Sequence, residues 1–490
     1  VCVPIEIKSA DHAKLFRFRC PLPHKLAEAR YPGTVDEKMG CEVGAYVWMQ
    51  ERCPDIRIPY LYGFGFSDGR CFTHEEQGPF YVRIARILQR CLRRCLGYST
   101  VLSRYVLNLP TSGYQLSTAH MLLEHIGPGI GEMLSNTWDA ERNNPVKRHT
   151  LLRGLAMLFV SLARVPQPRI GSFRFNDDCT VSLSNRPLTC SVMLWEISHM
   201  PRTIERDCTY SCANPYVSDL ITSQDSMFLS APNAAFDDED CRGHMAARSL
   251  VRLLSHRFIK REHRYGPFPL QLTDVNTSNI YVDRGWNITC LIDLEWICAL
   301  PVESLLVPHW LTGCAINKLS EPEFDKMQRE FIHAVQKEES KRTPVGHGFP
   351  LARTMEESWH PGVSWLWMVI HSNAMYSLVW KHIYPRFPVM ADRVLAEAVL
   401  SGCWREDSAQ VIRDKADQLK EHRQHVASLF TSHPAPASSP QLLLHLLDLI
   451  LHFHNFGHSL SFLSRQRVLD GLLRTWGLER VPYYTIDMVL

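Results

Sequence analysis

The stretch that decides the fold runs Gln271-Leu-Thr-Asp-Val-Asn-Thr-Ser-Asn-Ile-Tyr-Val-Asp283 and resumes at Ile292-Asp-Leu-Glu-Trp296. Apolar and β-branched residues on either side of a turn predict two strands between Asn279 and Ile292. Such a hairpin would return Asp293 to the loop that carries Asp274. An Asp with an Asn five residues later is weak evidence by itself, because about one such pair is expected by chance in a chain of this length. The ordered combination with the hairpin and Asp293 is far more specific.

Asp274, Asn279 and Asp293 are the types of side chain that phosphoryl transfer requires. The reaction needs a base that holds the acceptor hydroxyl, and metal ions that neutralise the phosphate oxygens. A carboxylate can serve as the base, whereas an Asn oxygen and a second carboxylate are hard ligands suited to Mg²⁺. The pattern therefore predicts a phosphoryl-transfer site around this loop.

Residues before the loop predict a β-rich region with one helix. Thr34 is placed as the helix N-cap, with Glu37 three residues later completing a capping box. A tight turn at residues 67–70 joins two strands as a hairpin. The predicted strands are Val1–Ile7, Leu15–Arg19, Tyr60–Phe66, Cys71–His74 and Ala119–Ile126, and the helix covers Val35–Glu51.

Helices dominate the remainder of the chain, which gives an α+β fold class. The predicted helices are 148–163, 244–258, 321–337, 363–382 and 391–429, with a hairpin at 173–183. A Ser/Pro/Ala-rich linker follows at 431–440, and a Leu- and His-rich helical tail follows it.

A charged pair is also predicted in the first region. Glu42 lies on the apolar side of the predicted helix, and a buried carboxylate is costly unless it is paired. Arg19, at the end of the preceding strand, is the natural partner and could also hold nucleotide phosphates, since guanidinium groups bind phosphate through two bonds. An ordinary structural ion pair is the alternative interpretation.

Several motifs in order resemble the aminoglycoside-phosphotransferase-like family, in particular its fungal kinase-like branch. The resemblance covers residues 1 to about 430. The matching stretches are Arg19-Cys-Pro-Leu-Pro23, Asp36-Glu-Lys-Met-Gly-Cys-Glu42, Cys53-Pro-Asp-Ile-Arg-Ile-Pro59, Tyr62-Gly-Phe-Gly-Phe-Ser67, Asn185-Arg-Pro187, Leu272-Thr-Asp274 and Asp293-Leu-Glu-Trp296.

The resemblance implies a two-lobed protein-kinase-like fold with ATP in the cleft. The small β-rich N-lobe would be residues 1–126. The large, mainly helical C-lobe would be residues 127–430, with an insertion at about 165–243 that could form a lid or substrate wall. The linker and tail at 431–490 lie outside the resemblance, and no role is assigned to them.

Carried over position by position, the resemblance implies roles for seven residues. Asp274 would be the catalytic base, and Asn279 and Asp293 would hold magnesium. The cofactor-binding residues would be Arg19 and Glu42, with adenine near the backbone of Glu124 and Ile126.

Two functions are compatible with these features. The first is an ATP- and Mg-dependent phosphotransferase that acts on a hydroxyl group of a small molecule. The second is a catalytically degenerate kinase-like fold that serves as a nucleotide sensor or a protein-interaction scaffold. Leu272 and Thr273 stand where the family usually has a His before the Asp, and a phosphate-binding Gly-rich loop is expected upstream of Val1. A protein kinase is a weaker third candidate, because neither Ala-Pro-Glu nor Asp-Phe-Gly occurs at the expected places.

Composition limits the partners. The 490 residues carry a formal net charge of +2, which gives no electrostatic case for nucleic acid. No run of 18 apolar residues occurs, so no membrane partner is expected. The 16 scattered cysteines form no CxxC pair, which favours free thiols in a cytoplasmic protein. The basic run Arg90–Arg94 is interpreted as a solvated helix face, and Cys91 and Cys95 as packed thiols.

Overall fold

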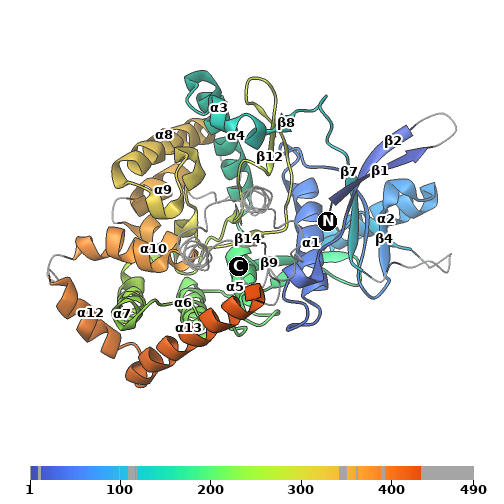
Figure 1. Cartoon of the computed structure of the whole chain (residues 1–490). Helices are drawn as coiled ribbons and strands as arrows, with labels where there is room; N and C mark the ends of the chain where they lie inside the picture. Colours follow the sequence, from blue (N-terminus) through green and yellow to red (C-terminus); the bar gives the residue numbers. More distant parts are fainter. Residues whose placement is uncertain are drawn as a thin grey trace. The chain divides into compact units, whose positions relative to one another are not determined.

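The computed structural model describes residues 2–8, 13–98, 100–108, 116, 118–341, 350–359, 362–387 and 392–431. These residues form an α+β structure, rich in strands in the N-terminal part and mostly helical in the C-terminal part (Figure 1). They divide into two compact units. The first contains the described residues up to Asp219 together with Ile259–Pro308 and Gln328–Pro361, and the second contains Leu220–Phe258, His309–Met327 and the described residues from Gly362. Among the described residues, no helix is long and apolar enough to cross a membrane.

A six-stranded antiparallel sheet lies in the first unit. Five of its strands were predicted from the sequence, and the sixth, β6, was not. The order is β1 (Cys2–Lys8), β2 (Ala13–Arg19), β7 (His120–Glu124), β3 (Leu61–Gly65), β4 (Cys71–His74) and β6 (Tyr105–Leu107). The predicted turn between β3 and β4 contains Gly69, whose φ of 85° suits a residue without a side chain.

Two smaller sheets contain the strands on either side of the loop at residues 273–279. One has the order β11 (Leu270–Leu272), β14 (Ile297–Ala299), β9 (Gly171–Phe175), β10 (Thr180–Asn185) and β5 (Val101–Leu102), and the other has β13 (Ile288–Leu291), β12 (Ile280–Val282) and β8 (Glu132–Met133). The predicted hairpins at 173–183 and around 280–291 are therefore confirmed. Segment 165–243, predicted as an insertion, supplies β9 and β10 to the same sheet as β11 and β14.

Helix α1 (Thr34–Arg52) is buried along most of its length, in agreement with its predicted apolar face. The predicted capping box is wrong, because Gly33 is the N-cap and its φ is 85°. The Glu28 carboxylate accepts hydrogen bonds from the Gly33 and Val35 amides instead. Glu37 is not available for capping, since its carboxylate binds the side chain of Arg186.

Gly44 allows α1 to lie very close to β9. A Cβ atom at this position would stand 2.9 Å from Phe173 Cβ and 3.2 Å from the Phe173 carbonyl carbon. Backbone atoms cannot move aside cheaply, so any side chain would separate the helix from the strand.

We expect Gly44→Ala to lower the free energy of unfolding by about 1–3 kcal/mol, because overpacking outweighs the better helix propensity of alanine. Gly40→Ala is the matched control in the same helix. Its Cβ would meet only Phe66 Cε1 at 3.9 Å, so it should raise stability by up to about 1 kcal/mol. Urea unfolding of the two variants measures the difference. Equal stabilities would contradict the close packing of α1 on β9.

The other α-helices belong to both units. They are α2 (Phe80–Cys95), α3 (Trp138–Glu141), α4 (Pro145–Ala163), α5 (Cys190–Ile197), α6 (Ala213–Ser230), α7 (Asp238–Leu254), α8 (Glu321–Ser340), α9 (Leu351–Trp359), α10 (Val363–Ile370), α11 (Met375–Leu378), α12 (Arg393–Gly402) and α13 (Ser408–Thr431). The sequence predicted one continuous helix at 363–382 and another at 391–429, and both predictions are wrong because each segment is interrupted. The first breaks after Ile370, and the second breaks after Gly402, where the Arg405 side chain folds back onto Asp407.

Helix α2 differs most from its prediction. The sequence pattern placed the arginines of the run 90–94 in solvent and the two thiols inside. Instead, Arg90 and Arg93 contact other parts of the unit, whereas Cys91 and Cys95 are exposed. The reason is an acidic partner on a neighbouring turn, Glu75, which attracts the arginine face of the helix.

Candidate functional site

The loop after β11 is fixed to the segment that follows Asp293. The amide and the hydroxyl of Thr273 both donate to the carbonyl of Trp296, at 3.1 and 2.8 Å. The amide of Ile292 donates to the carbonyl of Asn279 at 2.9 Å. These bonds hold the two halves of the decisive sequence side by side. Thr273 therefore has a structural role in this loop.

The three residues of the predicted trio line one small pocket. Asp274 and Asn279 come from the loop after β11, and Asp293 comes from the end of β13. The complete lining is Leu272, Thr273, Asp274, Val275, Asn279, Leu291, Ile292, Asp293 and Trp296. The pocket therefore combines carboxylate and amide groups with an apolar wall.

Asp274 has a basicity suited to proton transfer near neutral pH. Burial raises its pKa to about 7, and the charges of Asp293 and Glu295 contribute to the increase. The Asn276 side chain donates a hydrogen bond to the carboxylate at 3.3 Å, which opposes the increase. A carboxyl group with this pKa can accept a proton and release it again close to pH 7.

Asn279 is oriented by the backbone of the same loop. Its Nδ2 donates to the carbonyl of Asp274 at 2.8 Å. Because a carbonyl oxygen can only accept, this bond fixes which end of the amide is the nitrogen. The Asn279 Oδ1 therefore points away from that carbonyl and is available as a hard oxygen ligand.

Asp293 has a strained backbone, with a φ of 64°. Left-handed conformations are uncommon for residues other than glycine and gather at functional sites. Its Oδ1 lies 2.5 Å from Arg19 Nη2, and its side chain keeps 29 % of its surface exposed. The carboxylate can therefore contact both a cation from the six-stranded sheet and a ligand in the pocket.

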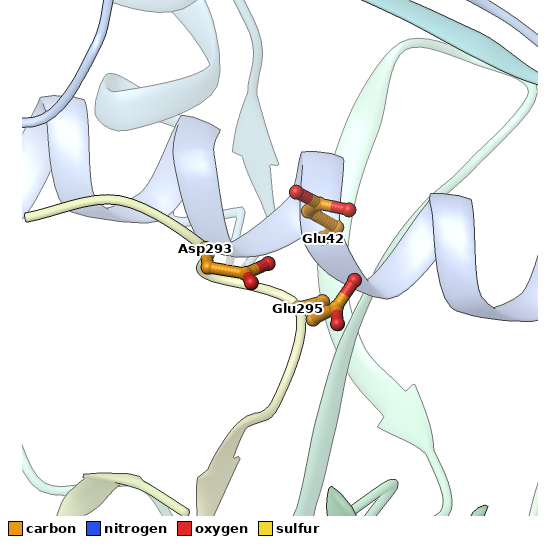
Figure 2. A group of neighbouring side chains, drawn as sticks. All are labelled: Glu42, Asp293 and Glu295. Atoms are coloured by element: carbon orange, nitrogen blue, oxygen red, sulfur yellow. The ribbon is translucent and has the colours of Figure 1, made fainter. Parts of the chain in front are cut away.

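A network of charges joins β2, α1 and the loop after β13. Arg19 contacts Glu42 at 3.0 Å and Glu295 at 2.6 Å, besides Asp293. Lys38 contacts Glu42 at 3.1 Å and also pairs with Glu295. Figure 2 shows the three carboxylates close together, with Glu42 on α1 and the other two on the loop. The predicted pair of Arg19 and Glu42 is part of this larger network.

The network shifts the pKa values of its charged side chains. Burial alone would lower the pKa of Arg19, but Glu42, Glu295 and Asp293 raise it well above its ordinary value. Burial alone would raise the pKa of Glu295, but Lys38 and Arg19 hold it below its ordinary value. Glu295 is therefore a carboxylate and Arg19 a cation throughout the physiological pH range.

Negative charge is in excess at the site. Glu42, Asp293 and Glu295 each offer an oxygen atom within 4.8 Å of the others, which is close enough to hold a metal ion. These three carboxyl groups face two cations, Arg19 and Lys38. A divalent cation would compensate the difference, and the oxygen ligands of Asn279 and Asp293 suit Mg²⁺.

No protein-family model, curated protein or solved structure matches this chain. The functional argument therefore rests on the geometry of the pocket and on the chemistry of its side chains.

Neither of the two residues predicted near adenine lines the pocket. The Glu124 carboxylate contacts Arg57 at 2.9 Å and accepts from the Tyr60 amide at 3.1 Å, and Glu124 does not line the pocket. Ile126 packs in an apolar cluster with Tyr281 and Cys290, and Ile292 joins this cluster from the pocket wall. Of the two, Ile126 is therefore connected to the pocket by packing.

Sequence reasoning missed three members of the site. Lys38 is almost fully buried, and its place one turn before Glu42 was the available signal. Glu295 was quoted in the motif without a role. Cys190, at the start of α5, feels the charges of Asp274, Glu295 and Asp293. Burial is the larger cause that raises its pKa well above its ordinary value. No sequence spacing connects Cys190 with the loop.

Proposed function

We propose that this protein is an ATP- and Mg-dependent phosphotransferase of the protein-kinase-like fold, acting on a hydroxyl group of a small molecule. One observation carries the proposal: Asp274, Asn279 and Asp293 share a pocket, and Asp293 is bonded to Arg19, which also binds Glu42. A base, two magnesium ligands and a phosphate-binding cation are the parts that phosphoryl transfer needs.

The strand order supports the kinase-like proposal. In the six-stranded sheet, β7 lies between β2 and β3, and α1 follows β2 in the chain. This order allows the cation at the end of β2 and the carboxylate on α1 to pair, and lets β7 lead toward the second part of the pocket. The sheet with α1 would then correspond to the smaller lobe, and the sheet that contains β11 and β14 to the larger lobe.

Each polar side chain of the pocket has a proposed role. Asp274 would accept the proton of the acceptor hydroxyl as the hydroxyl oxygen bonds to the terminal phosphorus of ATP and the bond to the bridging oxygen breaks, which releases ADP; the Asp274 pKa of about 7 suits this proton transfer. Asn279 Oδ1 and Asp293 would hold magnesium, which would neutralise charge on the phosphate oxygens. Arg19 would contact the phosphates while Lys38 keeps Glu42 and Glu295 neutralised.

The apolar side of the pocket favours the proposal that a nucleobase binds there. Ile292 lines the pocket and also packs against the cluster that contains Ile126, which follows β7. An aromatic ring such as adenine gains from contact with apolar side chains. The proposed adenine position is therefore next to Ile292 and the backbone that follows Glu124.

A specific observation favours the second candidate, a degenerate kinase-like scaffold. Arg19 contacts a metal ligand, Asp293, directly at 2.5 Å. In a scaffold this ion pair would take the place of the metal permanently. In an enzyme the pair would open when Mg-ATP arrives.

Binding of Mg-ATP separates the candidates, and we expect it to raise the melting temperature of the full chain. At a ligand concentration of about 100 Kd the stabilisation is about 2.7 kcal/mol, or roughly 2–4 °C in a chain of this size. Asp293→Ala should abolish the increase, and EDTA should do the same for the unaltered chain. Differential scanning fluorimetry measures both effects.

Asp177→Ala is the matched control for that experiment. Asp177 is an exposed turn aspartate that pairs with an arginine, Arg70, as Asp293 pairs with Arg19. Its variant should keep the full increase with Mg-ATP. If Mg-ATP leaves the melting temperature of the unaltered chain unchanged, the phosphotransferase proposal fails. An increase without ADP release across a panel of alcohols would support the scaffold.

A further inference from the structure

Helix α2 presents an apolar face to solvent along its whole length. None of its residues is buried. The large apolar side chains Phe80, Tyr81, Ile84, Ile87, Leu88 and Leu92 are each 51–68 % exposed. They recur at three- and four-residue intervals, so they form one continuous stripe on the helix. Scattered exposed apolar residues are common, but a contiguous stripe of this kind marks an interaction surface.

The opposite face of α2 holds the helix to its unit through arginines. Arg90 forms a two-bond pair with Glu75, at 2.6 and 2.8 Å. Arg86 donates to the carbonyls of Ser103 and Tyr105, at 2.8 and 3.0 Å. The helix is therefore anchored by polar bonds, with the apolar face turned away from the domain.

The charge of α2 indicates the chemistry of its partner. The 16 residues contain five arginines and no acidic residue. Two of the arginines, Arg83 and Arg94, are exposed. A helix with an apolar face of Phe, Tyr, Ile and Leu and an arginine-rich polar face is typical of helices that lie in a membrane interface.

We propose that α2 binds the surface of a membrane that carries anionic lipids. The apolar stripe would enter the region between headgroups and acyl chains, and Arg83 and Arg94 would extend to the lipid phosphates. The helix is about 24 Å long and would lie parallel to the membrane plane. None of the described helices could span a membrane, which does not conflict with this, because an interfacial helix needs no span.

A second copy of the chain is a poorer occupant of the same face. Two α2 helices packed through their apolar stripes would bring exposed arginines together at the rims, and α2 has no acidic side chain to pair with them. Like charges in such positions are repulsive. A membrane also needs no complementary groove, and Tyr81 has the apolar ring and polar tip favoured at the membrane interface.

Vesicle co-sedimentation of the full chain tests this proposal. Vesicles of phosphatidylcholine mixed with phosphatidylserine should bind the protein several-fold more than vesicles of phosphatidylcholine alone, and added salt should reduce the binding. The double variant Ile84→Glu/Leu88→Glu should lose about tenfold or more in binding, because it places two charges on the apolar face. Arg83→Gln/Arg94→Gln should lose about 25-fold with anionic vesicles, since each arginine near the surface contributes about fivefold.

Leu253→Glu is the matched control, because Leu253 on α7 is also an exposed leucine, at 57 %. It should bind vesicles as the unaltered chain does. Circular dichroism and melting curves should show every variant folded, since the replaced side chains are exposed. Absence of binding to anionic vesicles at low salt would overturn the proposal, and so would equal binding by Ile84→Glu/Leu88→Glu. A dimer that this double variant converts to a monomer, without vesicle binding, would assign the face to a second copy.

Discussion

Replacement of Asp274 by Asn should reduce phosphoryl transfer by about 10²–10⁴-fold while the increase in melting temperature with Mg-ATP persists. The amide keeps the shape of the side chain but cannot accept the hydroxyl proton. The measurement is ADP release from Mg-ATP in the presence of a panel of small-molecule alcohols. In the unaltered protein the rate should rise as pH increases through about 7, because the base must be deprotonated and its pKa is raised to that value.

Asp283→Asn is the matched control for this experiment. Asp283 lies on the turn of the same hairpin, where its carboxylate accepts from the Gly285 and Asn287 amides, and an Asn oxygen can accept in the same way. Its rate should equal that of the unaltered chain. An Asp274→Asn protein with full activity would remove the assigned base, even if nucleotide binding were intact.

Asp274→Asn should also stabilise the folded chain at alkaline pH. The pKa of Asp274 is about 7 in the folded state and near its ordinary value of 3.8 when unfolded. Between these values the folded state binds the proton more tightly, so its stability falls as pH rises through this window. At pH 8, Asp274→Asn should be more stable than the unaltered chain by on the order of 2 kcal/mol, after allowance for solvent screening. The difference should shrink toward pH 4, as urea unfolding at several pH values would measure.

Removal of Arg186 should have the largest effect on stability. Its side chain is 1 % exposed and pairs with Glu37 at 2.7 Å and with Glu196 at 2.5 Å. Arg186→Met would leave two buried carboxylates without this partner and should cost about 3–5 kcal/mol. Chemical unfolding measures the loss, and the variant should also expose apolar surface at moderate temperature.

Arg174→Met provides the comparison for Arg186→Met. Arg174 is on the adjacent strand β9 but is exposed, so its replacement should change stability by less than about 0.5 kcal/mol. Burial alone would raise the pKa of Glu196, but hydrogen bonds from Arg186 and Arg202 lower it. The stabilisation from this carboxylate is therefore present at neutral pH and is lost as pH falls below its ordinary range. Similar stabilities of the two methionine variants would contradict the buried network.

The parts that sequence reasoning anticipated depend on short-range patterns. The hairpin that returns Asp293 to Asp274 follows from the alternation of apolar residues around a turn. The pairing of Arg19 with Glu42 could be inferred because a carboxylate on a buried helix face needs a cation, and the nearest strand end offers one.

The missed parts depend on partners far away in the sequence. Glu37 fits a capping box locally, but Arg186, 149 residues later, binds its carboxylate. Lys38 is a residue type normally found in solvent, and its burial depends on Glu295 from the loop after β13. The prediction for α2 was wrong for Arg90, which pairs with Glu75, and for Cys91 and Cys95, which are exposed. Local propensity carries no information about such contacts.

The tight attachment of α1 to its neighbours limits how the activity of the protein could be regulated. An enzyme can be switched off when the helix that bears the carboxylate partner swings away from its cation. Here Glu37 of α1 is bonded to the buried Arg186, and Gly44 fits against Phe173 without a gap. With a cost of about 4 kcal/mol or more for separation, fewer than about one molecule in a thousand would have the helix displaced at any moment. Arg19 and Glu42 are thus held together in nearly all molecules. If the protein is the proposed phosphotransferase, regulation would act on the supply of nucleotide or acceptor, or on where in the cell the protein works.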